Sequence, residues 1–210
     1  FIDSELKTGN LDVNLIEKKI NKKTKAIVVV HYLGIPVEMK EIIKIAKKYN
    51  LFVLEDCALS LGAYYRNKHT GLIGDGGAFS FYPVKHITTG EGGMFVSKQQ
   101  KITKKINLIK AFGINKNHRE RIKSLSYDAI KLGFNYRLGE INSAIGIIQL
   151  KKIDKFLNIR KKNFLIYENY FKNHKKLNFL QSQSKNCKSS FYCFNLIFPK
   201  EILQKISRNK

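Results

Sequence analysis

The fold is decided by residues 26–56, AIVVVHYLGIPVEMKEIIKIAKKYNLFVLED. The stretch begins with a continuous apolar and β-branched run, residues 26–32, which is typical of a buried parallel strand. In residues 37–50 the apolar side chains recur at helical spacing, with charged side chains opposite them. Residues 51–56 form a second strand-like run. Strand, helix and strand in this order predict a βαβ unit with parallel strands and a right-handed crossover.

The rest of the chain predicts further strands and helices by the same rules. Strands are expected at 76–82, 93–98 and 191–198, and helices at 104–113, over 133–173 (two, or one that is kinked) and from 201 onward. Glycine-rich turns separate the first two of these strands, and Gly113 is placed to cap the helix before it. The whole pattern predicts an α/β fold with a mostly parallel central sheet and flanking helices.

The charge of the chain is strongly positive. It has 39 Lys and Arg against 16 Asp and Glu, a net charge of +23. A nucleic-acid partner would use such an excess, but the lysines are scattered over different elements, so nucleic-acid binding is not the favoured interpretation. The excess, mostly Lys, accompanies abundant Ile and Asn, as an AT-rich genome would impose. An anionic small substrate would also be attracted by this field.

Other classes are disfavoured by what the sequence lacks. No apolar run is long enough to cross a bilayer, and the first residues do not resemble a secretory signal. The three cysteines, Cys57, Cys187 and Cys193, form no CxxC pair. Free thiols in the cytoplasm are therefore expected, with no disulfide framework and no metal site.

Asp56 closes the strand 51–56. In open α/β sheets, ligands bind at the carboxyl ends of parallel strands, so this carboxylate is a candidate ligand-binding group. A carboxylate there needs a cation or hydrogen-bond donors. The structural alternative is that Asp56 caps the helix of a following segment, with Glu55 facing solvent.

Lys85 lies in FSFYPVKHITTGEGG, residues 79–93, between an apolar run and a glycine cluster. A lysine held in a constrained loop can act as a nucleophile toward a carbonyl group. Pyridoxal phosphate requires both a lysine for its aldehyde and a carboxylate for its ring nitrogen, so Lys85 and Asp56 together predict this cofactor. Ser80, five residues earlier, could donate to its phosphate. By itself, Lys85 would be interpreted as a surface lysine.

Three motifs resemble the DegT/DnrJ/EryC1/StrS family of pyridoxal-phosphate sugar aminotransferases: EDCALSLGA (55–63), GDGGAFSFYPVKHITTGEGGMF (74–95) and GFNYRLGEINSAIGIIQLKKID (133–154). The resemblance covers about residues 1–175. It implies the aspartate-aminotransferase fold (PLP fold type I), with a large cofactor-binding domain in residues 1–155 and the start of a small α/β domain in 156–210. It also implies that relatives extend beyond both ends, so we expect an incomplete product or fragment.

The resemblance assigns roles to individual residues. Lys85 matches the lysine that forms the Schiff base, Asp56 the partner of the pyridine nitrogen, and Ser80 a phosphate-binding serine. Asn135 matches an asparagine that reaches the phosphate in the neighbouring subunit, which implies a homodimer with shared active sites. His31 is expected either to point toward the phenolic oxygen of the cofactor or the substrate, or to be structural.

The function implied by the resemblance is transfer of an amino group from an amino acid, glutamate being expected, to a keto group of a nucleotide-linked sugar. One alternative is a dehydratase of the same family, which carries His at the position of Lys85 and whose run FSFYPxxHIT is similar. Another is a truncated relative that dimerises without catalysis. Leu59 stands where the family usually has Gln or His, so His31 is a candidate to replace that polar group.

Overall fold

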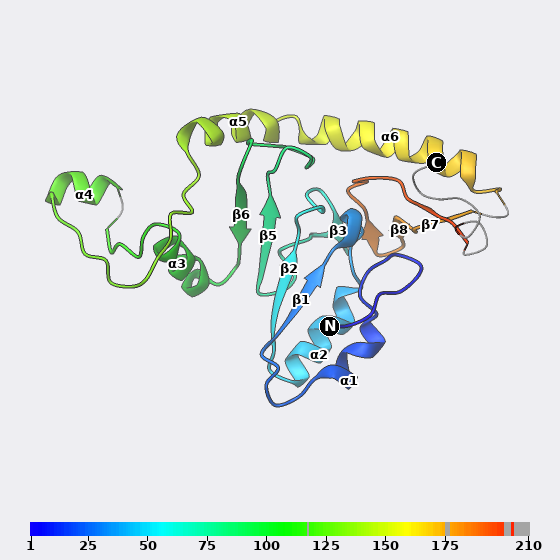
Figure 1. Cartoon of the computed structure of the whole chain (residues 1–210), viewed down its shortest axis with the longest axis horizontal. Helices are drawn as coiled ribbons and strands as arrows, with labels where there is room; N and C mark the ends of the chain where they lie inside the picture. Colours follow the sequence, from blue (N-terminus) through cyan, green and yellow to red (C-terminus); the bar gives the residue numbers. More distant parts are fainter. Residues whose placement is uncertain (117, 175–176, 200–202, 204–210) are drawn as a thin grey trace.

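The structure, a computed structural model, describes residues 1–116, 118–174, 177–199 and 203. Its centre is a four-stranded sheet in the order β1-β2-β5-β6. The strands are β1 (Ala26–Val30), β2 (Phe52–Asp56), β5 (Gly76–Ser80) and β6 (Gly93–Val96). The first three are parallel and β6 is antiparallel to β5, which agrees with the predicted mostly parallel sheet (Figure 1).

The predicted βαβ unit is confirmed. Helix α2 (Met39–Lys48) connects β1 to β2, and its apolar side packs on one face of the sheet. The core residues from these three elements are Ile27, Val29, Val53, Met39, Ile42 and Ala46. The short helix α1 (Ile16–Lys19) adds Ile16 to the same cluster, so the core lies on one side of β1 and β2.

The other face of β1 is not covered in the same way. Val28 and Val30 are 58% and 44% exposed, whereas Ile27 and Val29 are buried. The expectation of a strand buried on both faces is therefore wrong for β1. The physical reason is that α1 and α2 both pack against the face that carries Ile27 and Val29.

The second half of the chain is mainly helical. It comprises α3 (Gln100–Ile109), α4 (His118–Ser124), α5 (Glu140–Leu150) and α6 (Ile153–Phe171). Figure 1 shows α5 and α6 running across the end of the sheet, while the segment containing α4 extends away from the sheet. Two separate helices over 133–173 are one of the predicted alternatives. Gly113, with φ of +68°, donates its N–H to Leu108 O at the end of α3, as expected for a cap.

The remaining elements are short. They are η1 (Val13–Leu15), η2 (Tyr32–Gly34), β3 (Tyr64–Tyr65), β4 (Lys68–His69), β7 (Asn178–Phe179), β8 (Gln183–Ser184), β9 (Cys187–Lys188) and β10 (Leu196–Ile197). Strand β9 pairs with β3, so the chain after α6 returns to the first half of the molecule. None of the helices in the described ranges is long and apolar enough to span a bilayer.

The long strand predicted at 191–198 is wrong, because only β10 forms within it. Ser190, which comes just before the predicted strand, bonds through its N–H to Gly34 O and through its Oγ to Leu59 O. These bonds go to loops of the first half of the chain and not to a neighbouring strand. The helix expected from residue 201 lies outside the described residues except for Leu203. The predicted domain boundary at 155 falls inside α6, so this helix would link the two predicted domains.

Candidate active site

Asp56 lies at the carboxyl end of β2. It is aligned with Val30 on one side and with Ala78 on the other. Because side chains alternate along strands, Asp56 and Ser80 project from the same face of the sheet, at the same edge. Oδ1 of Asp56 accepts a hydrogen bond from Ala58 N at 3.0 Å. No helix begins there among the described residues, so this contact closes a turn and the helix-cap alternative does not apply.

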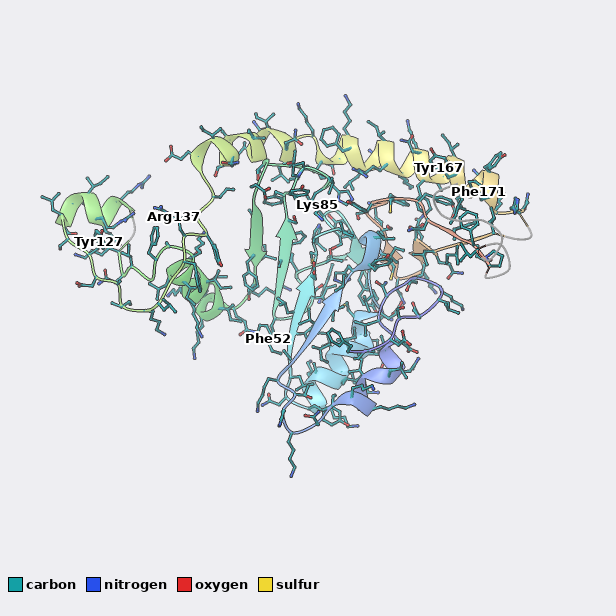
Figure 2. All side chains as sticks on the ribbon, in the orientation of Figure 1. Phe52, Lys85, Tyr127, Arg137, Tyr167 and Phe171 are labelled. Atoms are coloured by element: carbon teal, nitrogen blue, oxygen red, sulfur yellow. The ribbon has the colours of Figure 1, made fainter. Side chains whose placement is uncertain are left out.

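Lys85 lies in the loop that leaves β5 at this edge. The loop turns where Lys85 N bonds to Tyr82 O at 3.0 Å, and it folds back where Thr89 N bonds to Phe81 O. Figure 2 shows Lys85 near the carboxyl end of β5. The side chain is half-buried, and among the described residues no carboxylate lies within ion-pair distance of its Nζ. The amine is therefore available to a ligand.

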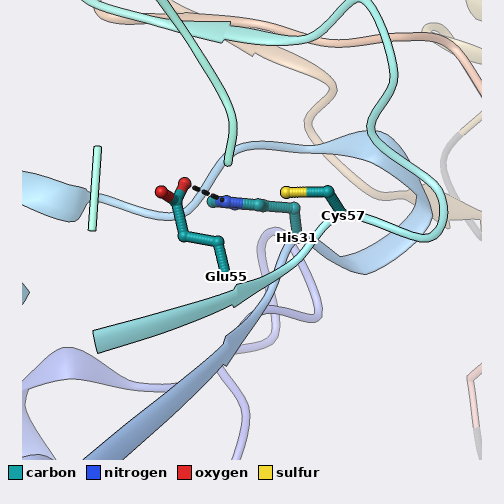
Figure 3. A group of neighbouring side chains, drawn as sticks. All are labelled: His31, Glu55 and Cys57. Carbon is teal, nitrogen blue, oxygen red and sulfur yellow. Dashed lines mark hydrogen bonds and ion pairs between the residues drawn. The ribbon is translucent and has the colours of Figure 1, made fainter. Parts of the chain in front are cut away.

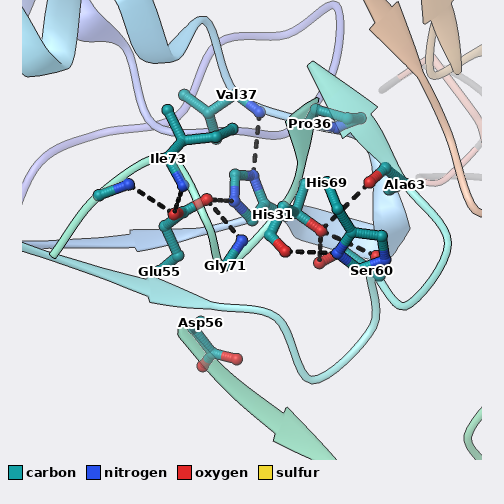
Figure 4. A network of polar contacts seen from close by, with 12 residues as sticks. His31, Pro36, Val37, Glu55, Asp56, Ser60, Ala63, His69, Gly71 and Ile73 are labelled. Carbon is teal, nitrogen blue, oxygen red and sulfur yellow. Dashed lines mark hydrogen bonds and ion pairs between the residues drawn. The ribbon is translucent and has the colours of Figure 1, made fainter. Parts of the chain in front are cut away.

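A buried polar network lies on the opposite face from Asp56 (Figure 4). Glu55 accepts hydrogen bonds with both oxygens; its donors are His31 Nε2 (2.9 Å), Gly71 N (2.8 Å), Ile73 N (2.8 Å) and Gly74 N (2.7 Å). Burial by itself raises the pKa of Glu55, but the bonds from His31 and from Gly74 and Gly71 outweigh it and the pKa falls below its ordinary value. The expectation that Glu55 faces solvent is wrong, since it has no exposed surface.

His31 is also fully buried in this network. Its Nε2 faces Glu55, and its Nδ1 accepts the N–H of Val37 at 3.1 Å. Both ring nitrogens are thus engaged within the protein, on the face of the sheet away from Asp56. This geometry supports the structural alternative for His31 over contact with a cofactor or substitution for the polar group missing at Leu59.

Cys57 approaches the same pair (Figure 3). Ligand atoms of His31, Glu55 and Cys57 lie within 4.8 Å of one another, a spacing that a metal ion could bridge. However, the oxygens of Glu55 and the nitrogens of His31 already have hydrogen-bond partners. Burial raises the pKa of the Cys57 thiol to about 12, so the sulfur is protonated at neutral pH. The cluster is suited to holding the fold together and not to binding a cation.

Asn135 lies far from these groups along the chain. It is exposed on the arm, the described residues from 110 to 139, and its Oδ1 accepts a hydrogen bond from Arg137 Nε at 3.0 Å. Figure 2 shows Arg137 on the arm beyond β6, well separated from Lys85. The structure therefore brings Asp56, Ser80 and Lys85 to one edge of the sheet and leaves Asn135 apart from them within a single chain.

The sequence matches the DegT/DnrJ/EryC1/StrS aminotransferase family over residues 1–209. The chain belongs to this family. This membership confirms the predicted resemblance.

Relatives within the family include named sugar enzymes. GDP-perosamine synthase of Escherichia coli O157:H7 is 38% identical, over 94% of this chain and 50% of its own length. The structure of the aminotransferase PseC of Helicobacter pylori, involved in pseudaminic acid biosynthesis, superposes with a TM-score of 0.90 at 33% identity, over 97% of this chain and 53% of that one. The chain spans about half the length of the curated relatives it matches.

A third relative has a different chemistry. GDP-4-keto-6-deoxy-D-mannose-3-dehydratase of E. coli, solved with bound hydrated PLP, has a TM-score of 0.83 at 30% identity, over 97% of this chain and 56% of that one. These superpositions confirm the predicted fold class, the PLP fold type I of the family's sugar aminotransferases. They also show that aminotransferases and dehydratases share the fold.

Sequence reasoning missed Tyr192, a neighbour of Lys85, and Arg160, which contacts Tyr192. The ring centre of Tyr192 lies 5.9 Å from Lys85 Nζ, and Arg160 Nη1 donates to Tyr192 O at 2.8 Å. Arg160 lies in α6, and Tyr192 lies within residues 191–198, which were predicted to form a strand. No local pattern connects them to Lys85, because the contact joins segments separated by most of the second half of the chain.

Proposed function

We propose that this family member is a pyridoxal-phosphate-dependent aminotransferase that moves an amino group from an amino acid, glutamate, to a keto group of a nucleotide-linked sugar. The observation that carries the proposal is that Asp56, at the carboxyl end of β2, and Lys85, in the loop that leaves the neighbouring β5, lie at one edge of the parallel sheet, with no ion pair at the Lys85 amine among the described residues. The names of the relatives, among them a GDP-perosamine synthase, support the sugar substrate.

The residues at this edge fit the proposed cofactor. In the described part of the chain, Asp56 uses Oδ1 for Ala58 and has no donor on Oδ2, which leaves an acceptor for a ring N–H. Ser80 lies on the same face, where its hydroxyl can donate to a phosphate. When bound, pyridoxal phosphate supplies an aldehyde that holds amines and a ring that accepts negative charge.

Each residue then has a defined task. The Asp56 carboxylate would accept the hydrogen of the ring nitrogen and keep that nitrogen positively charged. The Lys85 amine would remove the proton from the α-carbon of the amino donor and later return a proton to the product. Ser80 would hold the phosphate end in place, so that the reacting atoms stay aligned with Nζ of Lys85.

Lys85 also favours transamination over dehydration. The sugar dehydratases of the family carry His at this position, according to the resemblance described above. The neighbouring His86 cannot take over that role, because it is buried and its Nε2 lies 3.0 Å from Ser190 O, to which it donates. Burial, followed by the charges of Arg160 and Lys85, lowers the pKa of His86 to about 4, so it is neutral at pH 7.

A homodimer with shared active sites is part of the proposal. The arm and α5 expose large apolar side chains that a second copy could cover, among them Ile122, Leu125, Leu132, Tyr136, Ile141 and Ile147. Asn135 lies on the same arm and bonds to Arg137, which Figure 2 shows well separated from the Lys85 of its own chain. A symmetric partner would bring this asparagine to the phosphate of the neighbouring site.

The remaining predictions extend the proposal. The net charge of +23 favours a substrate that carries a diphosphate. The three cysteines are free thiols, which supports a cytoplasmic location. Residues 1–155 would form the cofactor-binding domain, and residues 156–210 would begin the small domain.

The test is direct amination. The protein is supplied with pyridoxal phosphate, glutamate labelled with heavy nitrogen and a panel of nucleotide-linked keto-sugars, and the products are analysed by mass spectrometry. We expect one sugar to gain the labelled nitrogen, and Lys85→Ala but not the control Lys98→Ala to abolish the gain. A product that loses a hydroxyl without gaining nitrogen would establish the dehydratase alternative. Cofactor binding without any sugar product would establish a non-catalytic role.

A further inference from the structure

The base of the Lys85 loop, which we define as residues 81–92 between β5 and β6, is closed by Thr89. Thr89 N donates to Phe81 O at 3.0 Å, and Thr89 Oγ1 donates to Glu91 O at 2.8 Å. Thr89 is almost completely buried. Because Lys85 lies between the two ends that Phe81 and Thr89 join, the position of Thr89 determines where the loop places Lys85.

Helix α5 holds this base through Asn142. Nδ2 of Asn142 donates to Thr89 O at 2.5 Å, so the N–H, the hydroxyl and the carbonyl of Thr89 are all bonded. In the described part of the chain, no other hydrogen bond joins α5 to the Lys85 loop. One turn further along the same face of α5, a Cβ added to Gly146 would lie 3.0 Å from Thr89 Cγ2. The helix therefore approaches Thr89 closely at two successive positions.

Asn142 and Gly146 are both unfavourable for a helix by themselves. Asn and Gly have lower helix propensities than Ala, and Gly is the poorer of the two. Asn142 does not compensate by capping the helix, because the N-cap residue is Gly139 and no side chain caps this end. Two locally unfavourable residues on the face that meets Thr89 indicate that this face serves a tertiary contact.

Further along, α5 packs less closely on the sheet. A hollow of about 420 Å³ lies between the two, lined on the helix side by Ile147 and Leu150 and on the sheet side by Phe79 and Met94. Side chains that line a hollow lose the dispersion contacts that close packing would give them. The contact of Asn142 and Gly146 with Thr89 is therefore a principal point at which α5 and the loop are held together.

We propose that Asn142 is a positioning residue for Lys85, because through Thr89 it fixes the base of the Lys85 loop against α5. This inference rests on the proposed function, since the position of Lys85 matters for catalysis only if its amine reacts. Helix α5 begins directly after the arm, which carries Asn135. The contact therefore couples the arm, which a second subunit would cover, to the reacting lysine of the same chain.

The first measurement is hydrogen exchange of the protein without cofactor, followed by mass spectrometry. Asn142→Asp replaces the donor by an acceptor that faces Thr89 O, while an acidic side chain in the first turn still suits the helix N-terminus. We expect the amides of residues 82–90 to exchange about five- to thirtyfold faster, the factor for one partly buried hydrogen bond left unpaired. Asn158→Asp makes the same change at an exposed site of α6 and should leave these amides as they are.

Local and global effects are separated in the same experiment. Strands β1 and β2 should stay protected at the labelling times that expose the loop of the variant. The proposal is overturned if residues 82–90 exchange as in the unchanged protein, or if β1 and β2 lose protection as early as the loop does. Asn142→Ala removes the donor without adding charge, and it gives the same comparison with Asn158→Ala if the aspartate variant does not fold.

The second measurement is the rate of amination with pyridoxal phosphate, glutamate and the sugar that the unchanged protein accepts. A displaced Lys85 slows the chemical steps but leaves the groups that bind the sugar in place. We therefore expect kcat of Asn142→Asp to fall about ten- to a hundredfold, while KM for the sugar stays within about twofold. An unchanged kcat, or a loss that appears only in KM, contradicts the positioning role.

The outcomes also separate this inference from the proposed function. If exchange of the loop rises as expected but the unchanged protein aminates no sugar, the contact between Asn142 and the loop stands and the proposed function fails. If the unchanged protein aminates a sugar and Asn142→Asp matches it in both measurements, the role of Asn142 fails and the function stands.

Discussion

Nε2 of His31 lies 2.9 Å from Oε2 of Glu55, and neither side chain has exposed surface. The pair joins the carboxyl ends of β1 and β2. The second oxygen of Glu55 also accepts hydrogen bonds from Ile73 N and Gly74 N, which lie just before the amino end of β5. Glu55 therefore connects β1, β2 and the segment that enters β5, on the face of the sheet opposite Asp56. The position of the proposed catalytic carboxylate depends on a buried carboxylate one residue before it.

Replacing Glu55 by Gln should destabilise the protein. The amide would place an N–H₂ against backbone N–H donors, which leaves buried donors unpaired, and the expected loss is about 2–4 kcal/mol of unfolding free energy. Urea unfolding followed by circular dichroism measures it. The control is Glu91→Gln, an exposed site where a change within about 0.5 kcal/mol is expected. Equal stability of the two variants would contradict a stabilising role for the hydrogen bonds of Glu55.

His86 should make stability depend on pH. Burial, with the charges of Arg160 and Lys85, lowers its folded-state pKa to about 4. An unfolded histidine titrates near 6.5, so the stabilisation is fully present above about pH 6.5 and is lost as pH falls toward 4. The total corresponds to roughly 3 kcal/mol.

The measurement is the unfolding free energy between pH 7 and pH 4.5. His86→Gln can still donate to Ser190 O but does not titrate, so its profile should be flatter than that of the unchanged protein. His174→Gln, at an exposed histidine, should leave the profile as it is. The pKa of Glu55 is also lowered, but Glu55 is present in all three proteins, so the difference isolates His86. Parallel profiles for His86→Gln and the unchanged protein would reject the assignment.

The sequence predicted the parts of this structure that depend on local periodicity. The strands and helix of residues 26–56 follow from neighbouring side chains, so their order and parallel pairing were predictable. Strand alternation also implies that Glu55 and Asp56 face opposite sides. It does not say which side is covered, because that depends on where α2 packs. The structural alternative for Asp56, which put Glu55 in solvent, could therefore not be rejected from the sequence.

The site was predictable where motifs are continuous and not where it depends on distant contacts. Lys85, Asp56 and Ser80 lie in the first half, near strand ends that the pattern identifies. Tyr192 lies near Lys85 because tertiary contacts hold residues 189–192, among them the hydrogen bond from Ser190 Oγ to Leu59 O, which joins segments far apart in sequence. Apolar and aromatic residues at 191–198 resemble a strand locally, and these tertiary hydrogen bonds override that preference.

Gly34 should be essential to the packing of residues 189–192. Its φ is +79°, and an added Cβ would lie 1.9 Å from Ser190 Oγ and 2.6 Å from Leu59 O. Gly90 has a similar φ of +77°, but the nearest atom to its Cβ is 3.7 Å away. Gly90→Ala should cost about 1–2 kcal/mol of unfolding free energy from backbone strain alone, whereas Gly34→Ala should cost clearly more because it also displaces Ser190. Similar losses for both variants, measured by urea unfolding, would argue against tight packing of residues 189–192 on Gly34.

Shared active sites can be tested by mixing inactive variants. In a dimer of Asn135→Ala with Lys85→Ala subunits, one site has both an intact Lys85 and the partner's intact asparagine. Random exchange in an equal mixture therefore gives about a quarter of the activity of the unchanged dimer. The control mixture pairs Lys85→Ala with Asp56→Ala, two residues that would act in the same site from the same chain, and no site in that mixture is complete. Activity is measured as transfer of labelled nitrogen to the sugar, and subunit exchange is verified by native mass spectrometry. If exchange occurs and the first mixture stays as inactive as the control, Asn135 does not serve the neighbouring site.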